Sequence, residues 1–283
     1  MHSLSAAATL ACLYEATAPK PGNVHPGRGF DDATYADFVA SAVVIGPMVA
    51  RAANQGVGET VLEAVRATRD ACPTNTNLGT LLLLAPLAAV PAEQSLAEGI
   101  SMVLSGLTSK DTQPIYEAIR LSGAGGLGRV ERADLFSDAP TIPLVEAMGL
   151  AADCDLVARQ YVTSFADVFQ AAAWVAEGLE RGWPLCDSIV HAHVRQMAAA
   201  PDSLIQRKCG LPVAQESSRR AERVLAAGVP GEPAYDEALA ELDSWLRADG
   251  HRRNPGTTAD LIAAGLFVLL RESRIDWNVV RWA

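Results

Sequence analysis

Residues 156–179, LVARQYVTSFADVFQAAAWVAEGL, carry the clearest indication of the fold. Apolar side chains recur there every three or four residues, which is the period of one face of an α-helix. The positions that make up this stripe are Leu156, Tyr161, Phe165, Val168, Phe169, Ala172, Val175 and Leu179. The pattern predicts a long helical stretch that buries one face.

The same period returns on both sides of this stretch. Residues 93–107 and 238–246 each place Leu, Ile, Val or Trp at helical spacing. No segment shows the sustained alternation of apolar and polar residues that is typical of a half-buried strand. We therefore predict an all-α protein with ten or more helices, no substantial sheet, and a single large multi-helix domain over residues 1–283.

Capping residues predict where several helices begin. In chain order, the expected starts are Asp31 or Asp32 before a helix from Ala33 to about Asn54, Gly58 or Glu59 before one that ends near Pro73, Thr76 or Asn77 before 78–87, and Thr257 or Thr258 before 259–270. Residues 227–234 are predicted to form a loop within the domain.

Composition excludes several classes of protein. The formal net charge of −10 disfavours sequence-independent nucleic-acid binding, which requires a basic surface. The longest apolar run, residues 81–92, contains two prolines and is too short to cross a bilayer of about 30 Å. The first residues lack the basic start of a signal peptide. The five cysteines show no CxxC pattern, so we expect buried free thiols and a cytoplasmic protein.

Four polar segments interrupt the helical pattern. In the first, residues 17–25, two prolines disfavour helix around Lys20, and Gly22 permits a turn. We expect this stiff loop to project Lys20, Asn23 and His25. An ordinary proline-glycine connector is the alternative.

The second segment, residues 74–79, reads TNTNLG and directly precedes an apolar helix. A helix N-terminus presents unpaired N–H groups and a positive dipole, which suit a phosphate. Asn75, Thr76 and Asn77 add polar side chains at the same place. A simple N-cap would account for one of these residues but not for all three.

The third segment, residues 123–128, is GAGGLG and is followed by Asp134. No strand precedes it, so it does not match the dinucleotide-binding fingerprint, and a flexible connector is the favoured interpretation.

The fourth segment, residues 249–260, contains a proline-glycine turn and places Asp260 in the first turn of the last predicted helix. Asp260 could serve the helix dipole. It could also lie beside a bound phosphate, bridged by a divalent cation such as Mg2+. Asp153 and Asp155 come before Arg159, which lies about one turn beyond Asp155, and the three could form only a local ion pair. His191 and His193 lie two residues apart on different helix faces, so we predict no shared metal.

The segments APKPGNVH at 18–25, NTNLG at 75–79 and NPGTTADL at 254–261 resemble, in this order, TPKPGLVD, NTHKG and PGGAADLLA of the triphosphoribosyl-dephospho-CoA synthase family. The likeness extends over nearly the whole chain. The chain departs from the family at Asn77 and Leu78, which replace His and Lys, and at His25, which replaces an acid. It is therefore similar to a divergent branch, the synthase-like proteins of archaea and one-carbon-metabolising bacteria.

The resemblance implies a transferase that joins an ATP-derived triphosphoribosyl group to an acceptor hydroxyl and releases adenine. Its partners would be ATP or a related phosphoribosyl donor and a small-molecule acceptor, with no nucleic acid and no membrane; a homo-oligomer is left open. The acceptor could instead belong to a tetrahydromethanopterin-like cofactor pathway. The chain could also be a helical protein that binds nucleotides without catalysis.

The resemblance also implies roles for single residues. A cation at the triphosphate requires carboxylates, for which Asp260 and Glu15 are the candidates; either could also stabilise positive charge at the ribose C1′. Mg2+ is expected to arrive with ATP. His25 could act as acid or base because its ordinary pKa lies near 6.5. The candidates for binding phosphate or substrate are Lys20, Asn23, Asn75, Thr76, Asn77, Arg159, Thr257 and Thr258.

Overall fold

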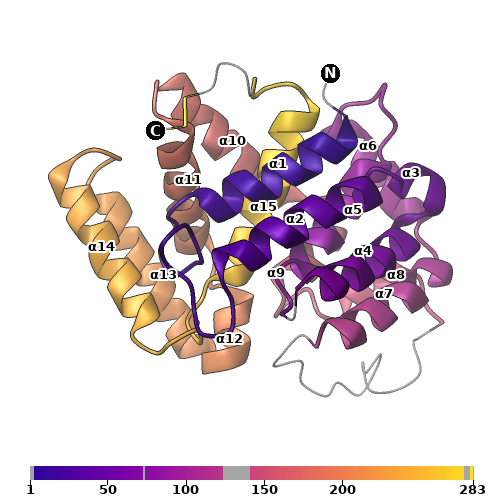
Figure 1. The fold of residues 1–283 in the computed structure, drawn as a ribbon, viewed down its shortest axis with the longest axis horizontal. Coiled ribbons are helices and arrows are strands. Elements are labelled where there is room, and N and C mark those ends of the chain that lie inside the picture. The colour runs from indigo at the N-terminus through magenta and orange to yellow at the C-terminus, as the bar shows by residue number, and fades with distance from the viewer. Residues whose placement is uncertain (1–2, 73, 124–140, 277–280, 283) are drawn as a thin grey trace.

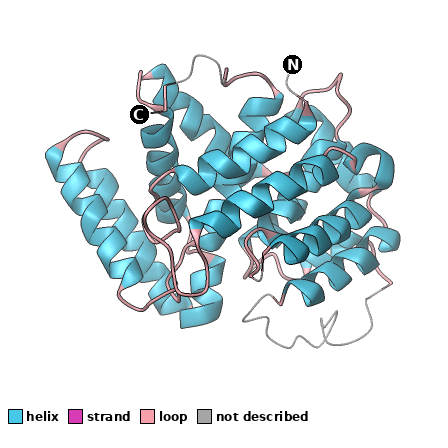
Figure 2. Ribbon diagram, in the orientation of Figure 1, coloured by secondary structure: helices cyan, strands magenta, loops and turns pink. Residues whose placement is uncertain are grey.

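The computed structural model describes residues 3–72, 74–123, 141–276 and 281–282. Within these ranges the chain forms fifteen helices and no sheet, and its β structure is limited to two isolated bridges, His25–Arg28 and Phe30–Ala33 (Figures 1 and 2). The prediction of an all-α fold is confirmed. The helices are α1 Leu4–Thr17, α2 Tyr35–Val49, α3 Ala52–Gln55, α4 Val57–Ala71, α5 Leu78–Ala89, α6 Leu96–Gly106, α7 Ser109–Ser122, α8 Leu144–Gly149, α9 Leu156–Val162, α10 Ala166–Glu180, α11 Leu185–Ala199, α12 Ser203–Cys209, α13 Leu211–Ala226, α14 Pro233–Arg247 and α15 Gly256–Arg271.

Two helices form the centre of the molecule. Nearly every residue of α5 and most residues of α15 are buried, which is expected of helices that are apolar on all sides. The two pack against each other, with α1, α10 and α11 around α15 and with α2, α4 and α6 around α5 (Figure 1). The first turn of α15 is thereby held deep in the protein, beside the start of α5.

A second, smaller core lies between α11, α12, α13 and α14, which stand at one side of the molecule in Figure 1. Helix α11 contributes to both cores: Ile189 and Ala192 face the main core, whereas Val194 and Met197 face the smaller one. A shared helix ties the two cores together. The single-domain organisation over residues 1–283 remains a prediction.

The start of α2 differs from the prediction. The helix begins at Tyr35 rather than Ala33, because Thr34 and Asp37 form a capping box in which the Thr34 backbone N–H and hydroxyl donate to Asp37 at 2.8 and 2.7 Å. Asp32 instead accepts from His251. The helix ends at Val49, and the short α3 follows as a separate element.

The predicted helical stretch of residues 156–179 divides into α9 and α10. Ser164 and Phe165 adopt left-handed backbone conformations, with φ of 51° and 64°, and this interrupts the helix. Phe165 is nevertheless fully buried with Tyr161 and Val168, so the apolar stripe still faces the core. The burial was predicted correctly, while the break in the helix was not.

The remaining predicted elements lie close to their expected positions. Helices α4, α5, α6 and α14 overlap their predicted segments. Helix α15 begins at Gly256, so Thr257 and Thr258 lie within its first turn and do not cap it. Gly123 ends α7 with a φ of 62°, whereas 124–128 and Asp134 lie outside the described residues.

Composition led to one expectation about the cysteines and one about membrane-spanning helices. All five cysteines are free; Cys72 is buried, Cys12, Cys186 and Cys209 are half-buried, and Cys154 is exposed. Among the described residues, none of the helices combines the length and the apolar character needed to span a membrane.

Candidate active site

The second and fourth polar segments meet where α15 crosses the start of α5. The hydroxyl of Thr80 donates to Oδ1 of Asp260 at 2.6 Å. Gly79 lies directly beneath the same carboxyl group: a Cβ on Gly79 would stand 2.6 Å from Cγ of Asp260, and closer still to Oδ2. Only glycine therefore fits under Asp260, and the two motifs form one structural unit.

Glu15 and Lys20 form an ion pair beside this unit. Lys20 Nζ lies 2.9 Å from Oε1 of Glu15 and also donates to the backbone carbonyls of Glu15 and Ala18. The lysine is completely buried and Glu15 nearly so. The expectation that the loop projects Lys20 and Asn23 is therefore wrong, because the proline-containing loop folds back and returns the lysine stem against the end of α1, and Asn23 is buried as well.

Burial and neighbouring charge shift the acidity of the cluster. Desolvation raises the pKa of Asp260 to about 8, with Glu15 and Asp202 adding repulsion, while hydrogen bonds from Thr80 act in the opposite direction. Part of the Asp260 side chain still reaches solvent. At neutral pH this carboxyl group is mainly protonated and can donate a proton. Burial also raises the pKa of the Cys12 thiol, with Glu15 and Asp260 adding to the effect.

Asp202 is the buried carboxylate that the sequence analysis missed. Its Oδ1 accepts from the backbone N–H groups of Leu204 and Ile205 and so caps α12, while its Oδ2 accepts from the N–H and hydroxyl of Thr258 at 2.7 and 2.8 Å. Next to it, Ser203 and Thr257 share a hydrogen bond of 3.0 Å between their hydroxyls. Thr257 and Thr258 thus anchor α15 to α12.

The first polar segment packs against the fourth. The side-chain amide of Asn23 donates to Asn254 at 2.6 Å, and Asn254 in turn contacts His251 at 2.8 Å. The backbone N–H of Gly22 donates to Asp243 of α14 at 2.8 Å. His25 is half-buried, with its Nδ1 3.1 Å from the carbonyl of Pro26, and burial lowers its pKa.

The three polar residues just before α5 differ in their exposure. Asn75 is exposed, and its Oδ1 accepts from the backbone N–H of Leu78 at 3.2 Å. Thr76 is half-buried. Asn77 is buried and pairs with the hydroxyl of Thr68 on α4. Asn75 is the one of the three that remains accessible to a ligand.

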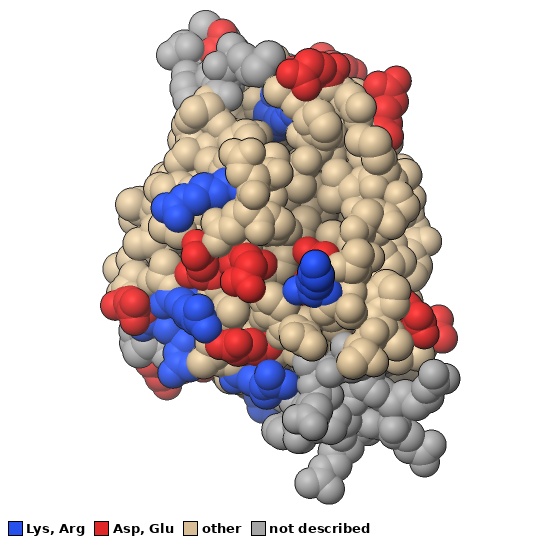
Figure 3. Space-filling view, turned by 90° about the vertical axis from the view of Figure 1, so that its right-hand side faces the viewer, with Lys and Arg blue, Asp and Glu red and all other residues tan. Residues whose placement is uncertain are grey.

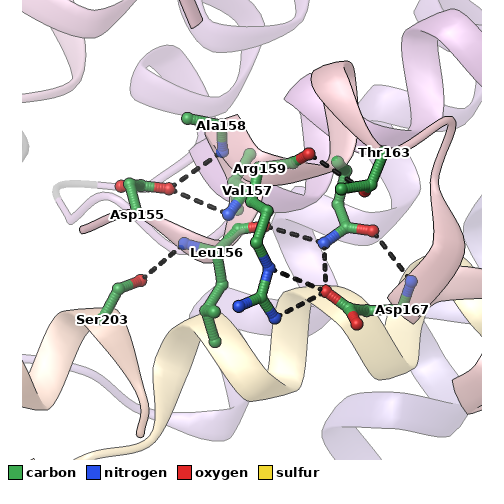
Figure 4. A network of polar contacts seen from close by, with 9 residues as sticks. Asp155, Leu156, Val157, Ala158, Arg159, Thr163, Asp167 and Ser203 are labelled. Atoms are coloured by element: carbon green, nitrogen blue, oxygen red, sulfur yellow. Dashed lines mark hydrogen bonds and ion pairs between the residues drawn. The ribbon is translucent and has the colours of Figure 1, made fainter. Parts of the chain in front are cut away.

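Arg159 belongs to a different network (Figure 4). Its guanidinium donates to Oδ2 of Asp167 at 2.7 and 3.1 Å, and the side-chain amide of Gln160 donates to the same oxygen at 2.7 Å. Asp155 instead caps α9 and pairs with Arg207. The predicted local ion pair between Asp155 and Arg159 is therefore wrong, because the break after α9 brings Asp167 closer.

His191 and His193 are both buried, on α11. His191 Nδ1 lies 3.0 Å from the hydroxyl of Tyr235. Neither ring nitrogen of His193 has a hydrogen-bond partner among the described residues. Burial, and then the charge of Lys20, lower the pKa of His193 well below its ordinary value. It stays neutral at physiological pH.

The described part of the chain holds no group of three or more His, Cys, Asp or Glu side chains that could bind a metal. Glu15 and Asp260 are carboxylates that lie near each other, and a Mg2+ ion carried by a phosphate substrate uses only one or two protein carboxylates. Their oxygens therefore suit a substrate-borne cation, although Lys20 already neutralises Glu15.

One face of the molecule combines an uncharged area, a band of mixed charges and a hollow (Figure 3). The face that includes α3 and α6 shows a broad uncharged area above a band where Lys and Arg mix with Asp and Glu (Figure 3). A hollow of about 390 Å³ lies between α3, α6 and the end of α5.

The structure thus brings together Glu15, Lys20 and Asp260 and joins Asn23 to the fourth segment through Asn254. Asn75 lies just before α5, whose first turn meets Asp260 through Thr80. Arg159 lies apart in its network with Asp167. The roles assigned to all of these residues stay predictions.

Comparison with known proteins identifies the family of the chain. A crystal structure from Archaeoglobus fulgidus, described as a proposed triphosphoribosyl-dephospho-CoA synthase, superposes with a TM-score of 0.63 and 26% sequence identity, over 83% of this chain and 98% of that one. No curated protein matches the sequence. The ATP:dephospho-CoA triphosphoribosyl transferase family matches residues 1–279, almost the full length. The chain belongs to the ATP:dephospho-CoA triphosphoribosyl transferase family of enzymes.

Proposed function

We propose that this transferase moves the triphosphoribosyl group of ATP to a hydroxyl of a small-molecule acceptor and releases adenine. The contact of Asp260 with Gly79 and Thr80 is the observation that supports the proposal, because it brings two of the three family segments together around one ionisable carboxyl group. Dephospho-CoA is the acceptor that the family's own reaction favours.

The reaction breaks the bond between C1′ of the ribose and N9 of adenine and forms a bond between C1′ and the acceptor oxygen. The acceptor hydroxyl loses a proton, and the departing adenine gains one. Protonated Asp260, whose pKa is about 8, is suited to donate that proton near neutral pH. Positive charge that develops at C1′ would be stabilised by a nearby carboxylate such as Glu15.

The triphosphate requires donors and a cation. The start of α5 offers backbone N–H groups, and Asn75 is accessible beside them. Mg2+ bound to ATP would take oxygens from Asp260 or Glu15. A metal ligand must be ionised, whereas a proton donor must not be, so the two roles of Asp260 are alternatives. The raised pKa favours the proton donor.

The tetrahydromethanopterin-like acceptor and a protein that binds nucleotides without turnover are the competing proposals. Both competing proposals rest on the replacement of the family's His and Lys by Asn77 and Leu78. Asn77 is buried against Thr68 and Leu78 is buried in the main core, so neither replacement leaves a charged group at the start of α5.

Adenine release tests the proposal. Purified protein is incubated with MgATP and a panel of acceptors that includes 3′-dephospho-CoA and pterin-linked ribosides, and free adenine is measured by chromatography. Asp260→Asn should reduce release by at least a hundredfold, since general acid catalysis contributes roughly 10²–10⁴-fold. Asp70→Asn, at an exposed carboxylate on α4, is the matched control. ATP binding without adenine release from any acceptor would support the non-catalytic alternative.

We further propose that the enzyme works in the cytoplasm, where ATP and its acceptor are available, and that it contributes to cofactor biosynthesis. The absence of a membrane-spanning helix among the described residues agrees with this placement. Whether the enzyme forms a homo-oligomer can be measured by light scattering.

A further inference from the structure

A small cavity lies beside α9 and α12, two helices that contact α15. Its volume is about 140 Å³, and it is bordered by the segment before α9, by α12 and by the start of α13. Ligand sites for whole drug-sized molecules are about 300–1,000 Å³. This cavity can therefore hold one small ring system, but neither a complete ATP molecule nor a folded triphosphate.

The walls of the cavity combine two kinds of surface. Ala152, Leu156, Ala200, Pro201 and Leu211 provide apolar contact, which suits the faces of a planar ring. Asp153 and Gln206 add polar groups at the border, and neither side chain forms a hydrogen bond or an ion pair with the described residues. A carboxylate accepts hydrogen bonds, and an amide both donates and accepts them. The two together match the amino group and ring nitrogens of a purine.

The charge of the cavity argues against a phosphate. Arg159 is neutralised by Asp167 (Figure 4), and Asp155 is neutralised by Arg207. Asp153 remains as an unpaired negative charge among the described residues. The cavity therefore repels an anion and favours a base that is neutral or gains a proton, as adenine does when it leaves the ribose.

The position of the cavity connects it to Asp260. Ser203 lines the cavity, and its hydroxyl bonds that of Thr257 at 3.0 Å. Thr257 and Asp260 are three residues apart on α15, hence about 4.5 Å apart along the helix axis at 1.5 Å per residue. This hydrogen bond connects the wall of the cavity to the turn of α15 that carries Asp260.

We propose that this cavity is the subsite for the adenine of the nucleotide donor. The assignment rests on the proposed function for the identity of the donor, but it makes a separate claim about where the base binds. Asp153 and Gln206 would contact the base edge, and Leu156 and Leu211 its faces.

Adenine binding tests the subsite directly. Calorimetry with adenine alone should show binding to the parent protein. Gln206→Leu should weaken it about tenfold, the effect expected for loss of one hydrogen bond, and Asp153→Asn should weaken it less, because Asn keeps an acceptor oxygen but loses the charge. Gln113→Leu and Asp70→Asn, at exposed positions on α7 and α4, should leave the affinity unchanged. No binding of adenine by the parent, or equal affinity in the cavity variants, would overturn the assignment.

A second measurement needs no variant. Cys154 lines the cavity and is exposed, so saturating adenine should slow its alkylation by iodoacetamide several-fold, with the partly exposed Cys186 on α11 as internal reference. Tripolyphosphate should give no protection. Protection by tripolyphosphate but not by adenine would overturn the proposal and mark a phosphate site. If adenine protects Cys154 but ATP yields no free adenine, the subsite stands and the proposed transferase reaction fails.

Discussion

Replacing Gly79 by alanine should destabilise the protein, although the same change usually stabilises a helix. Alanine is favoured over glycine by about 0.8–1.0 kcal/mol in a helix interior. At Gly79, however, the new Cβ would lie 2.6 Å from Cγ of Asp260, well inside van der Waals contact. Overpacking of this kind costs about 1–3 kcal/mol. Movement of Asp260 also sacrifices its hydrogen bond with Thr80, which contributes about 0.5–1.5 kcal/mol.

We therefore expect Gly79→Ala to lower the free energy of unfolding by about 1–3 kcal/mol after the gain in helix propensity is subtracted. Urea unfolding followed by circular dichroism measures this change. Gly106→Ala is the matched control, because it changes a glycine at the end of α6 where a Cβ meets no atom within 4 Å. This control should be neutral or slightly stabilising.

The clash also predicts a coupling between the two positions. In the background of Asp260→Ala, the carboxyl group is absent and Gly79→Ala should no longer destabilise. The double-mutant cycle should then give an interaction energy of about 1–3 kcal/mol. Equal stability of Gly79→Ala and the parent, together with an interaction energy near zero, would refute the seating of Asp260 on Gly79 and the proposed site with it.

Three further perturbations test other parts of the structure. Lys20→Ala should cost about 3–5 kcal/mol in urea unfolding because it leaves Glu15 buried and unpaired, and addition of Glu15→Gln should restore part of the loss; unchanged stability would show that the pair is not buried. Burial lowers the pKa of His191 from 6.5 to about 4, so the unfolded chain binds more protons between these values, and the free energy of unfolding decreases as the pH is lowered from about 6.5 to about 4; His191→Phe should make this decrease shallower, and an identical slope would contradict the assignment. EDTA should weaken ATP binding in calorimetry, and equal affinity with and without EDTA would argue against a cation at Asp260 or Glu15.

The helices were predictable because their signal is local. The apolar period identified α6, α10 and α14. The break between α9 and α10 escaped prediction because Ser164 and Phe165 are not residues that normally adopt left-handed backbone conformations.

The environment of the site residues was much less predictable. Prolines around Lys20 indicate a loop, but the sequence does not show that the loop folds back onto Glu15. Asp202 resembles an ordinary N-cap, and it does cap α12; its second role depends on Thr258, which lies 56 residues further along the chain. The sequence Pro201-Asp-Ser before a helical segment was the available signal for the cap, and only tertiary contact reveals the rest.

The contacts that build the site also determine when it can form during synthesis. Thr80 and Asp260 are separated by 180 residues, and Gly22 and Asp243 by 221. Contacts of such long range are established late, since most of the intervening chain must already be ordered. A nascent chain that ends before α15 can fold α1, α2 and α4 into packed helices but lacks the carboxyl group that completes the site. Catalytic competence should therefore arise only after α15 has left the ribosome and packed against α5.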